Sequence, residues 1–256
     1  MTDRYGPRGV VALHVPLQNS NMQPEYDMLR PQGINNQIYR IDLGTPDKVS
    51  EATAAVIKGC LGCWPDIVVV GNSIEMRDWS IERQKKHRRI LQNAIGDIPL
   101  ILGGDATVLA LQAVGVRKVA MLSPMHARYS GSARSFYEAM GFDVVVDHCL
   151  DVQRPEEIIK VPDDVILQAF EEMDRPEVDT LLHVGGALAV LPLVEQLEAK
   201  HGKPVIAVNA ASYWCALKKL GLADQIEGFG ALLKLPLPAA LEGHAKPSGG
   251  NVNGAV

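Results

Sequence analysis

The chain has 256 residues, of which 47% are hydrophobic and 21% charged, with 30 acidic against 25 basic side chains. This composition is typical of a globular protein and excludes a collagen-like, low-complexity or disulfide-scaffold chain. The formal net charge of −5 disfavours a nucleic-acid partner, because binding to phosphates needs a basic surface.

The predicted elements follow one another as short apolar runs and longer amphipathic segments. This alternation is typical of parallel strands covered by helices, and it predicts the α/β class. In chain order the elements are strand Val10–Val15, strand Gln37–Leu43, helix Pro46–Gly62, strand Asp66–Val70, helix Met76–Ala94, strand Pro99–Leu102, helix Ala106–Val114, strand Lys118–Leu122, helix His126–Met140, strand Phe142–Val146, helix Asp163–Met173, strand Asp179–Val184, helix Leu188–His201, strand Pro204–Val208 and helix Ser212–Leu220.

An internal repeat indicates how these elements are grouped. Residues 66–71 read DIVVVG and residues 179–185 read DTLLHVG, while 97–101 (DIPLI) are echoed by 202–206 (GKPVI). We therefore predict two similar Rossmann-like halves, 1–115 and 116–235, with parallel sheets related by a pseudo-twofold, and a flexible tail over 236–256. Ligands of parallel sheets bind beyond the carboxyl ends of the strands, so the site is expected in the cleft between the halves.

Location and cofactors are predicted from what the sequence lacks. No run approaches the roughly 20 apolar residues of a membrane helix, and residues 1–8 have no apolar signal-peptide core, so we expect a cytoplasmic protein without a membrane partner. Only Cys60 and Cys63 lie close together, and no second CxxC or histidine pair has metal spacing. We expect packed free thiols, no metal and no cofactor.

Five segments together resemble a known superfamily. They are NSNMQPE (19–25), GNS (71–73), VRKVAMLSP (116–124), VGG (184–186) and NAASYW (209–214). Their order and spacing are similar to those of the aspartate/glutamate racemase superfamily, in its maleate cis-trans isomerase and arylmalonate decarboxylase branch. The resemblance implies a two-half α/β fold, a cofactor-free site for a small carboxylate or dicarboxylate, and chemistry through an enolate-like species.

The chain departs from this branch at both cysteine positions. The resemblance implies one cysteine in each half of the racemases, and only the second in the decarboxylase. Here the first position is Gly71 and the second is Val184. Proton transfer by a thiol is therefore not expected at either position.

Two glycine-containing turns are the candidate anion sites. Gly71, Asn72 and Ser73 follow a predicted strand, where amides and side chains can donate to a carboxylate or an enolate oxygen. The alternative is that Asn72 or Ser73 only caps a helix. Gly185 and Gly186 can direct backbone N–H groups into the cleft, or form a plain turn.

Three further residues complete the expected binding site. Asn21 matches, by resemblance, an asparagine that maleate isomerases use to hold a substrate carboxylate; its alternative is turn formation. Met125 stands where the family commonly has a tyrosine. We expect Met125 and Val184 to lie beside the substrate.

The proton-moving group is left open between several residues. His126, at the end of the fifth strand, or Ser73 are the catalytic candidates, although His126 can equally cap the helix that follows. His183 should face away from the cleft if Val184 faces it, because strand residues alternate. Glu75 and Asp105 become acid or base candidates only if burial raises their pKa; otherwise they support helix starts.

These observations predict a cofactor-independent lyase or isomerase, acting on a small carboxylic or dicarboxylic acid through an enolate-type intermediate without cysteine acid/base catalysis. One alternative is a non-catalytic protein that binds or senses small acids. Another is a hydrolase or hydratase that uses Ser73 or bound water. We also expect a homo-oligomer.

Overall fold

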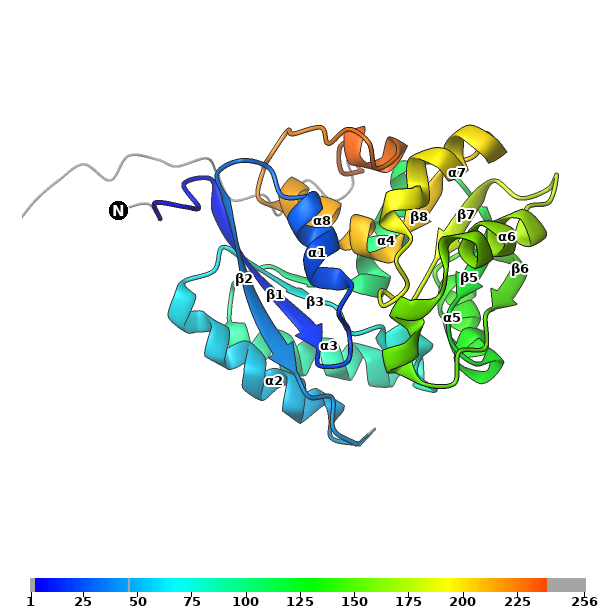
Figure 1. The fold of residues 1–256 in the computed structure, drawn as a ribbon. Coiled ribbons are helices and arrows are strands. Elements are labelled where there is room, and N and C mark those ends of the chain that lie inside the picture. Colours follow the sequence, from blue (N-terminus) through cyan, green and yellow to red (C-terminus); the bar gives the residue numbers. More distant parts are fainter. Residues whose placement is uncertain (1–2, 46, 239–256) are drawn as a thin grey trace, which may run out of the picture.

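Two parallel four-stranded sheets stand side by side in the computed structural model, which describes residues 3–45 and 47–238 (Figure 1). The first has the strand order β2-β1-β3-β4, and the second has β6-β5-β7-β8. The strands are β1 (Gly9–Pro16), β2 (Ile34–Ile41), β3 (Ile67–Val70), β4 (Leu100–Leu102), β5 (Lys118–Ser123), β6 (Asp143–Cys149), β7 (Thr180–His183) and β8 (Val205–Ala207). The helices are α1 (Met22–Met28), α2 (Val49–Gly59), α3 (Ile81–Ile95), α4 (Gly103–Ala113), α5 (Ala127–Ala139), α6 (Asp163–Met173), α7 (Val194–His201) and α8 (Val208–Lys219).

The predicted fold class is confirmed, because the two sheets repeat one topology. The inner strands β1, β3, β5 and β7 are apolar and almost wholly buried, as expected for strands covered on both faces. The edge strand β2 reads INNQIYRI and is only partly buried. Most of the predicted tail, residues 239–256, lies outside the described residues.

Equivalent backbone bonds follow β3 and β7. The Gly71 N–H donates to the His14 carbonyl at 2.8 Å, and the Val184 N–H donates to the Leu122 carbonyl at 3.0 Å. His14 pairs with the last residue of β3, and Leu122 with the last residue of β7. Gly71 and Val184 therefore hold matching positions at the carboxyl ends of corresponding strands.

Helices α4 and α8 join the two halves. Each begins directly after a strand and packs against the other, and α8 also contacts β3 and β4 of the opposite sheet (Figure 1). A Cβ atom on Gly103 would lie 3.2 Å from Val208 Cγ2, so the glycine permits this close approach. The first ten residues of α8 are all buried.

Several predicted helix limits were wrong, and one helix was missed. The helix predicted from Met76 starts only at Ile81, because Ile74–Met76 form a separate 3₁₀ turn and the Ser80 hydroxyl accepts from the Arg83 N–H. Helix α8 starts at Val208, with no loop after β8, rather than at Ser212. Helix α1 escaped prediction because it is short and lies in a polar segment.

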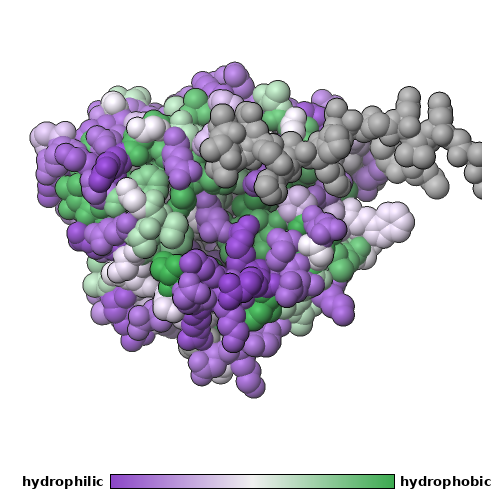
Figure 2. All heavy atoms as spheres, turned by 180° about the vertical axis from the view of Figure 1, so that it is seen from behind, coloured by the Kyte–Doolittle hydropathy of each residue, from purple (hydrophilic) through white to green (hydrophobic). Residues whose placement is uncertain are grey.

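Of the helices in the described ranges, none has the length and apolar character required to cross a bilayer. On the face seen in Figure 2, hydrophobic side chains occur in small groups between polar ones.

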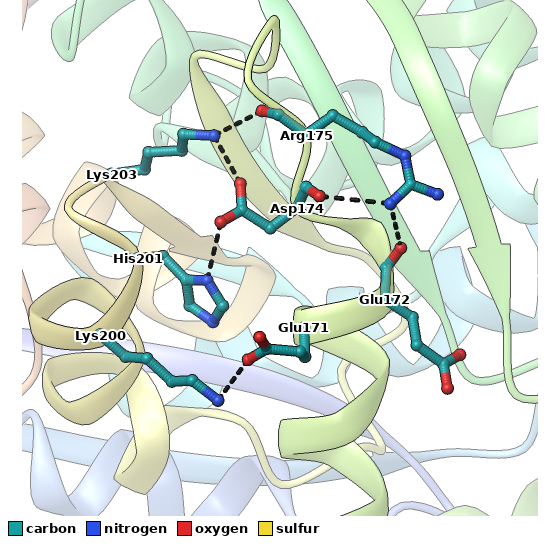
Figure 3. Close-up of polar contacts among 7 residues, drawn as sticks. All are labelled: Glu171, Glu172, Asp174, Arg175, Lys200, His201 and Lys203. Atoms are coloured by element: carbon teal, nitrogen blue, oxygen red, sulfur yellow. Dashed lines mark hydrogen bonds and ion pairs between the residues drawn. The ribbon is translucent and has the colours of Figure 1, made fainter.

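A polar cluster holds α6 against α7 at the amino-terminal edge of the second sheet (Figure 3). His201 Nδ1 donates to the Asp174 carboxylate at 2.9 Å, and Lys203 Nζ donates to its other oxygen. Lys203 also donates to the Arg175 carbonyl at 2.6 Å. Burial alone would raise the pKa of Asp174, but the hydrogen bonds from Lys203 and His201 lower it.

We expect Asp174→Asn to lower the free energy of unfolding by about 1–2 kcal/mol near neutral pH, because hydrogen bonds to a charged group are lost. The lowered pKa of Asp174 means that its stabilisation is present above the unfolded pKa and is lost as pH falls through the folded value. Urea unfolding at pH 7 and pH 3 measures this. The exposed Glu177 provides the control Glu177→Gln, and an equal loss in both variants would contradict the prediction.

Candidate active site

A cavity of about 330 Å³ lies between the halves at the carboxyl ends of the strands. Its walls come from both sheets, through the turns that follow β1, β3, β5 and β7. Six of the predicted site residues line it together: Gly71, Asn72, Ser73, Met125, Gly185 and Gly186. The two glycine turns thus line the same cavity.

Unsatisfied donors surround this cavity. Asn72 is 3% exposed, and its Nδ2 has no acceptor among the described residues; the same holds for Arg77 Nε. The backbone N–H groups of Ser73 and Gly186 likewise find no backbone acceptor in the described part of the chain. A buried donor without a partner costs about 1–3 kcal/mol, so side-chain movements that turn Asn72 Nδ2 or Arg77 Nε toward an anion in the cavity would be favoured.

Arg77 is the site residue that the sequence did not reveal. It was placed inside a predicted helix, whereas it is extended and follows the 3₁₀ turn Ile74–Met76. The Ser132 hydroxyl from α5 lies within hydrogen-bond distance of the carbonyls of both Arg77 and Glu75, so its one proton can be shared between them and hold this conformation. Of the described residues that line the cavity, Arg77 is the one cation and Asp42 the one carboxylate. Burial lowers the pKa of Arg77, because a buried charge without a counter-charge is disfavoured.

Asn21 lies behind the second glycine turn and does not line the cavity. Its Nδ2 donates to the carbonyls of Gly186 at 3.3 Å and Leu188 at 3.1 Å. Asn209 from α8 donates to the same Gly186 carbonyl at 2.9 Å. A Cβ atom on Gly186 would lie 2.2 Å from Asn209 Oδ1, so only glycine fits here. The two amides fix this turn so that its N–H groups can face the cavity.

Glu25 continues this support from α1. Its carboxyl accepts from Asn209 Nδ2 at 2.6 Å and from the Leu191 N–H at 3.2 Å. Burial raises the pKa of Glu25 to about 7, against the hydrogen bonds of Asn209, Asn21 and Leu191, which lower it. A residue of the first half thus holds two segments of the second.

The two candidate histidines both bind backbone groups. His126 is half-exposed and caps α5, since its Nδ1 accepts from the Arg128 N–H at 3.2 Å; it does not line the cavity. His183 is buried, with Nε2 3.2 Å from the Gly185 carbonyl, and burial lowers its pKa to about 4. His183 is therefore a neutral donor that supports the glycine turn.

The two positions that the sequence resemblance matched to cysteines, Gly71 and Val184, are surrounded by apolar groups. A Cβ atom on Gly71 would lie 2.1 Å from Met22 Cε, so the methionine occupies the space of a side chain at position 71. Val184 is fully buried in the core and does not line the cavity. All four cysteines of the sequence are described, and none belongs to the cavity wall.

Burial raises the pKa of both carboxyl candidates, Glu75 and Asp105. It raises the pKa of Glu75, which is fully buried, to about 7. Burial also raises the pKa of Asp105, although the ion pair with Arg88 opposes this. Glu75 meets the condition that the sequence set for an acid near neutral pH.

A family model for arylmalonate decarboxylase matches residues 66–233. The chain belongs to this family. Among curated relatives, the maleate isomerase of Nocardia farcinica is 29% identical over 130 residues, which cover 50% of this chain and 52% of the relative. The maleate isomerase of Pseudomonas putida is 26% identical over 165 residues, covering 59% and 62%. The matches thus span about half to two thirds of these relatives.

Solved structures of this family share the fold over nearly their full length. A maleate isomerase of Pseudomonas putida S16 superposes with a TM-score of 0.79 at 18% identity, covering 88% of this chain and 98% of that one. A crystal structure of arylmalonate decarboxylase gives 0.72 at 18% identity, covering 88% and 98%. A mutant maleate cis-trans isomerase of Nocardia farcinica, with a covalently bound succinylcysteine intermediate, gives 0.77 at 20% identity and the same coverage.

In this family member, Glu25→Gln should make stability less sensitive to pH. A pKa raised on folding favours the protonated folded state, so the contribution of Glu25 is full below its unfolded pKa and is lost as pH rises through about 7. The loss between pH 5 and pH 8 should shrink by roughly 3 kcal/mol, the equivalent of the pKa shift. Unfolding in urea at both pH values measures it, with the exposed Glu138→Gln as control. An unchanged difference between the two pH values would contradict the assignment.

Proposed function

We propose that this protein is a cofactor-independent decarboxylase of small dicarboxylic acids of the malonate type, working through an enolate-type intermediate and without cysteine. Membership of the arylmalonate decarboxylase family and similarity to maleate isomerases support a lyase or isomerase of small acids. The observation that carries the proposal is the cavity between two glycine turns, with the unpartnered donors of Asn72 and Arg77 in its wall.

Decarboxylation is favoured over isomerisation by the residues that replace the thiols. A related isomerase structure holds a succinylcysteine intermediate, which needs a thiol to attack the substrate. Gly71 and Val184 supply none, and no cysteine lines the cavity. Loss of CO₂ from a malonate needs only stabilisation of the developing charge and a proton for the carbon.

The reaction follows from the arrangement of donors. Arg77 and Asn72 bind the carboxylate that is retained, while the second carboxylate lies against the apolar part of the wall at Pro124, Met125 and Ile158. The bond to that second carboxylate breaks, CO₂ leaves, and the electron pair moves into the retained group as an enediolate. Donors at fixed positions around its oxygens contribute several kcal/mol. The carbon then takes a proton from the Ser73 hydroxyl.

The test is turnover of phenylmalonate, methylmalonate and maleate, followed by CO₂ release and by deuterium incorporation in D₂O. We expect CO₂ from at least one malonate, with one deuteron in the product. Thermal stabilisation by these acids without any chemical change would instead identify a binding protein. Oxygen from labelled water in the product would identify the hydrolase or hydratase with Ser73. If the protein neither turns over these acids nor is stabilised by them, the proposed site is overturned.

Arg77→Gln should raise KM for the malonate by about 10- to 100-fold, because a charged hydrogen bond to the carboxylate is lost. Arg77→Lys should recover part of the affinity, since it keeps the charge but not the two-pronged donor geometry. Steady-state kinetics measure both, with the exposed Arg89→Gln of α3 as control. Equal KM values in all four proteins would remove Arg77 from the site.

Ser73→Ala should lower kcat by about 100-fold with little change in KM, because a proton donor to the transition state is removed. The same assay on His126→Ala decides between Ser73 and the histidine as the proton-moving group. A loss confined to His126→Ala would transfer the role to that residue.

A further inference from the structure

Glu75 stands in the wall between two cavities. On one side of the 3₁₀ turn Ile74–Met76, the residues Ser73, Met76 and Arg77 line the candidate active site. On the other side is a second cavity of about 210 Å³, lined by Ile74, Glu75, Gln84, Arg88, Gly104 and Phe136 among others. The turn thus contributes residues to both cavities, and Glu75 is its titratable group.

The carboxyl of Glu75 is buried without a hydrogen bond of good geometry. The residue is 0% exposed, and neither oxygen has a donor among the described residues. A Cβ atom on Gly104 would lie 3.1 Å from its Oε2, so α4 closes over the carboxyl. An ionised carboxylate in such a place lacks the donors that normally compensate its charge.

The groups around Glu75 bring its pKa close to neutral pH, so that its protonated form is well populated there. Burial, the largest effect, raises its pKa to about 7, and the negative charge of Asp105 adds to the rise. The backbone N–H of Glu75 itself, Ser73 and Arg77 lower the pKa, in that order of size. Tyr137 also faces this position; its hydroxyl is buried without a partner, and its pKa is raised by burial and by Glu75.

Ser73 connects this carboxyl with the active-site cavity. Its side chain stabilises the ionised form of Glu75 and lines the cavity, yet no hydrogen bond of good geometry joins the two residues. Rotation of the Ser73 hydroxyl about a single bond can make that bond. Hydrogen bonds that transfer protons are often poorly aligned without substrate and tighten in the complex.

We propose that Glu75 supplies the proton that Ser73 delivers to the substrate carbon, and that it is reprotonated through the second cavity. This inference rests on the proposed decarboxylation. Glu75 acts through Ser73 and is in that sense a positioning residue, because it does not line the active-site cavity itself.

Each proton and electron pair is accounted for. The electron pair on the enediolate carbon takes the Ser73 proton and forms the new C–H bond. In the same step the Ser73 oxygen takes the proton of Glu75, which becomes a carboxylate. A proton from solvent then returns to Glu75 through the second cavity, once the carboxyl has turned toward it, because neither oxygen is accessible to water in this structure. No oxidant, reductant or further reactant is needed.

The experiment compares the pH dependence of phenylmalonate turnover in wild type and Glu75→Gln. The acid must be protonated to act, so wild-type kcat should fall tenfold per pH unit above about pH 7. Glu75→Gln should lose about 10- to 100-fold in kcat, lack this fall and keep KM within about twofold. Glu138→Gln, on the exposed face of α5, is the control and should retain the wild-type profile.

Asp105→Asn gives a second test that does not require Glu75 to be replaced. Removing the negative charge of Asp105 should lower the pKa of Glu75 and move the fall in kcat to lower pH. A purely structural role of Glu75 predicts no such displacement. If Glu75→Gln does not fold, this displacement alone decides the matter.

One further variant tests the second cavity, and two outcomes separate this inference from the proposed function. Met140→Trp should fill part of the second cavity, whose wall includes Met140, and lower kcat without moving the pH profile. If wild type releases CO₂ but Glu75→Gln keeps its kcat and pH profile, the role of Glu75 is overturned while the decarboxylase remains. If wild type acts on no diacid, both the function and the inference fall.

Discussion

The close contact between α4 and α8 is the constraint on which the rest of the molecule depends. Each helix leaves its strand without a loop, and the two cross where Gly103 lets Val208 approach to van der Waals distance. Because α8 packs on the strands of the opposite sheet, the two sheets cannot separate without exposing its buried residues. This contact holds the carboxyl ends of β3 and β7 on opposite sides of one small space.

Much of this arrangement could be predicted from the sequence, since it depends on local patterns. The buried strands are continuous apolar runs, and the repeated DIVVVG and DTLLHVG segments indicate two matching halves. The glycine turns follow from the same runs. Arg77 could not be predicted in this way, because its extended conformation depends on Ser132, 55 residues further along the chain. Asn21 was predicted to hold a substrate carboxylate, whereas in the structure its amide binds the carbonyls of Gly186 and Leu188, contacts that depend on tertiary structure.

The two glycine turns of the site are held in place by residues at different separations along the sequence. Asn21, Glu25 and Asn209 form a buried hydrogen-bonded group behind the second turn, while the first turn is held by its own strand. Such a group fixes geometry at low cost only when every member is paired. Asn209 Oδ1 is the member left without a partner in the described structure, and it lies against Gly186. Rigid support from behind leaves the donors in front free for an anion.

Met22 has a consequence for how this family member can change. Its methyl group occupies the volume that any side chain at position 71 would need. A cysteine introduced there would require the flexible end of Met22 to move aside, whereas trimming Met22 would leave an empty hole in the core. Whether this wall of the site can carry a side chain therefore depends on the rotamer of one flexible neighbour and not on the strands around it.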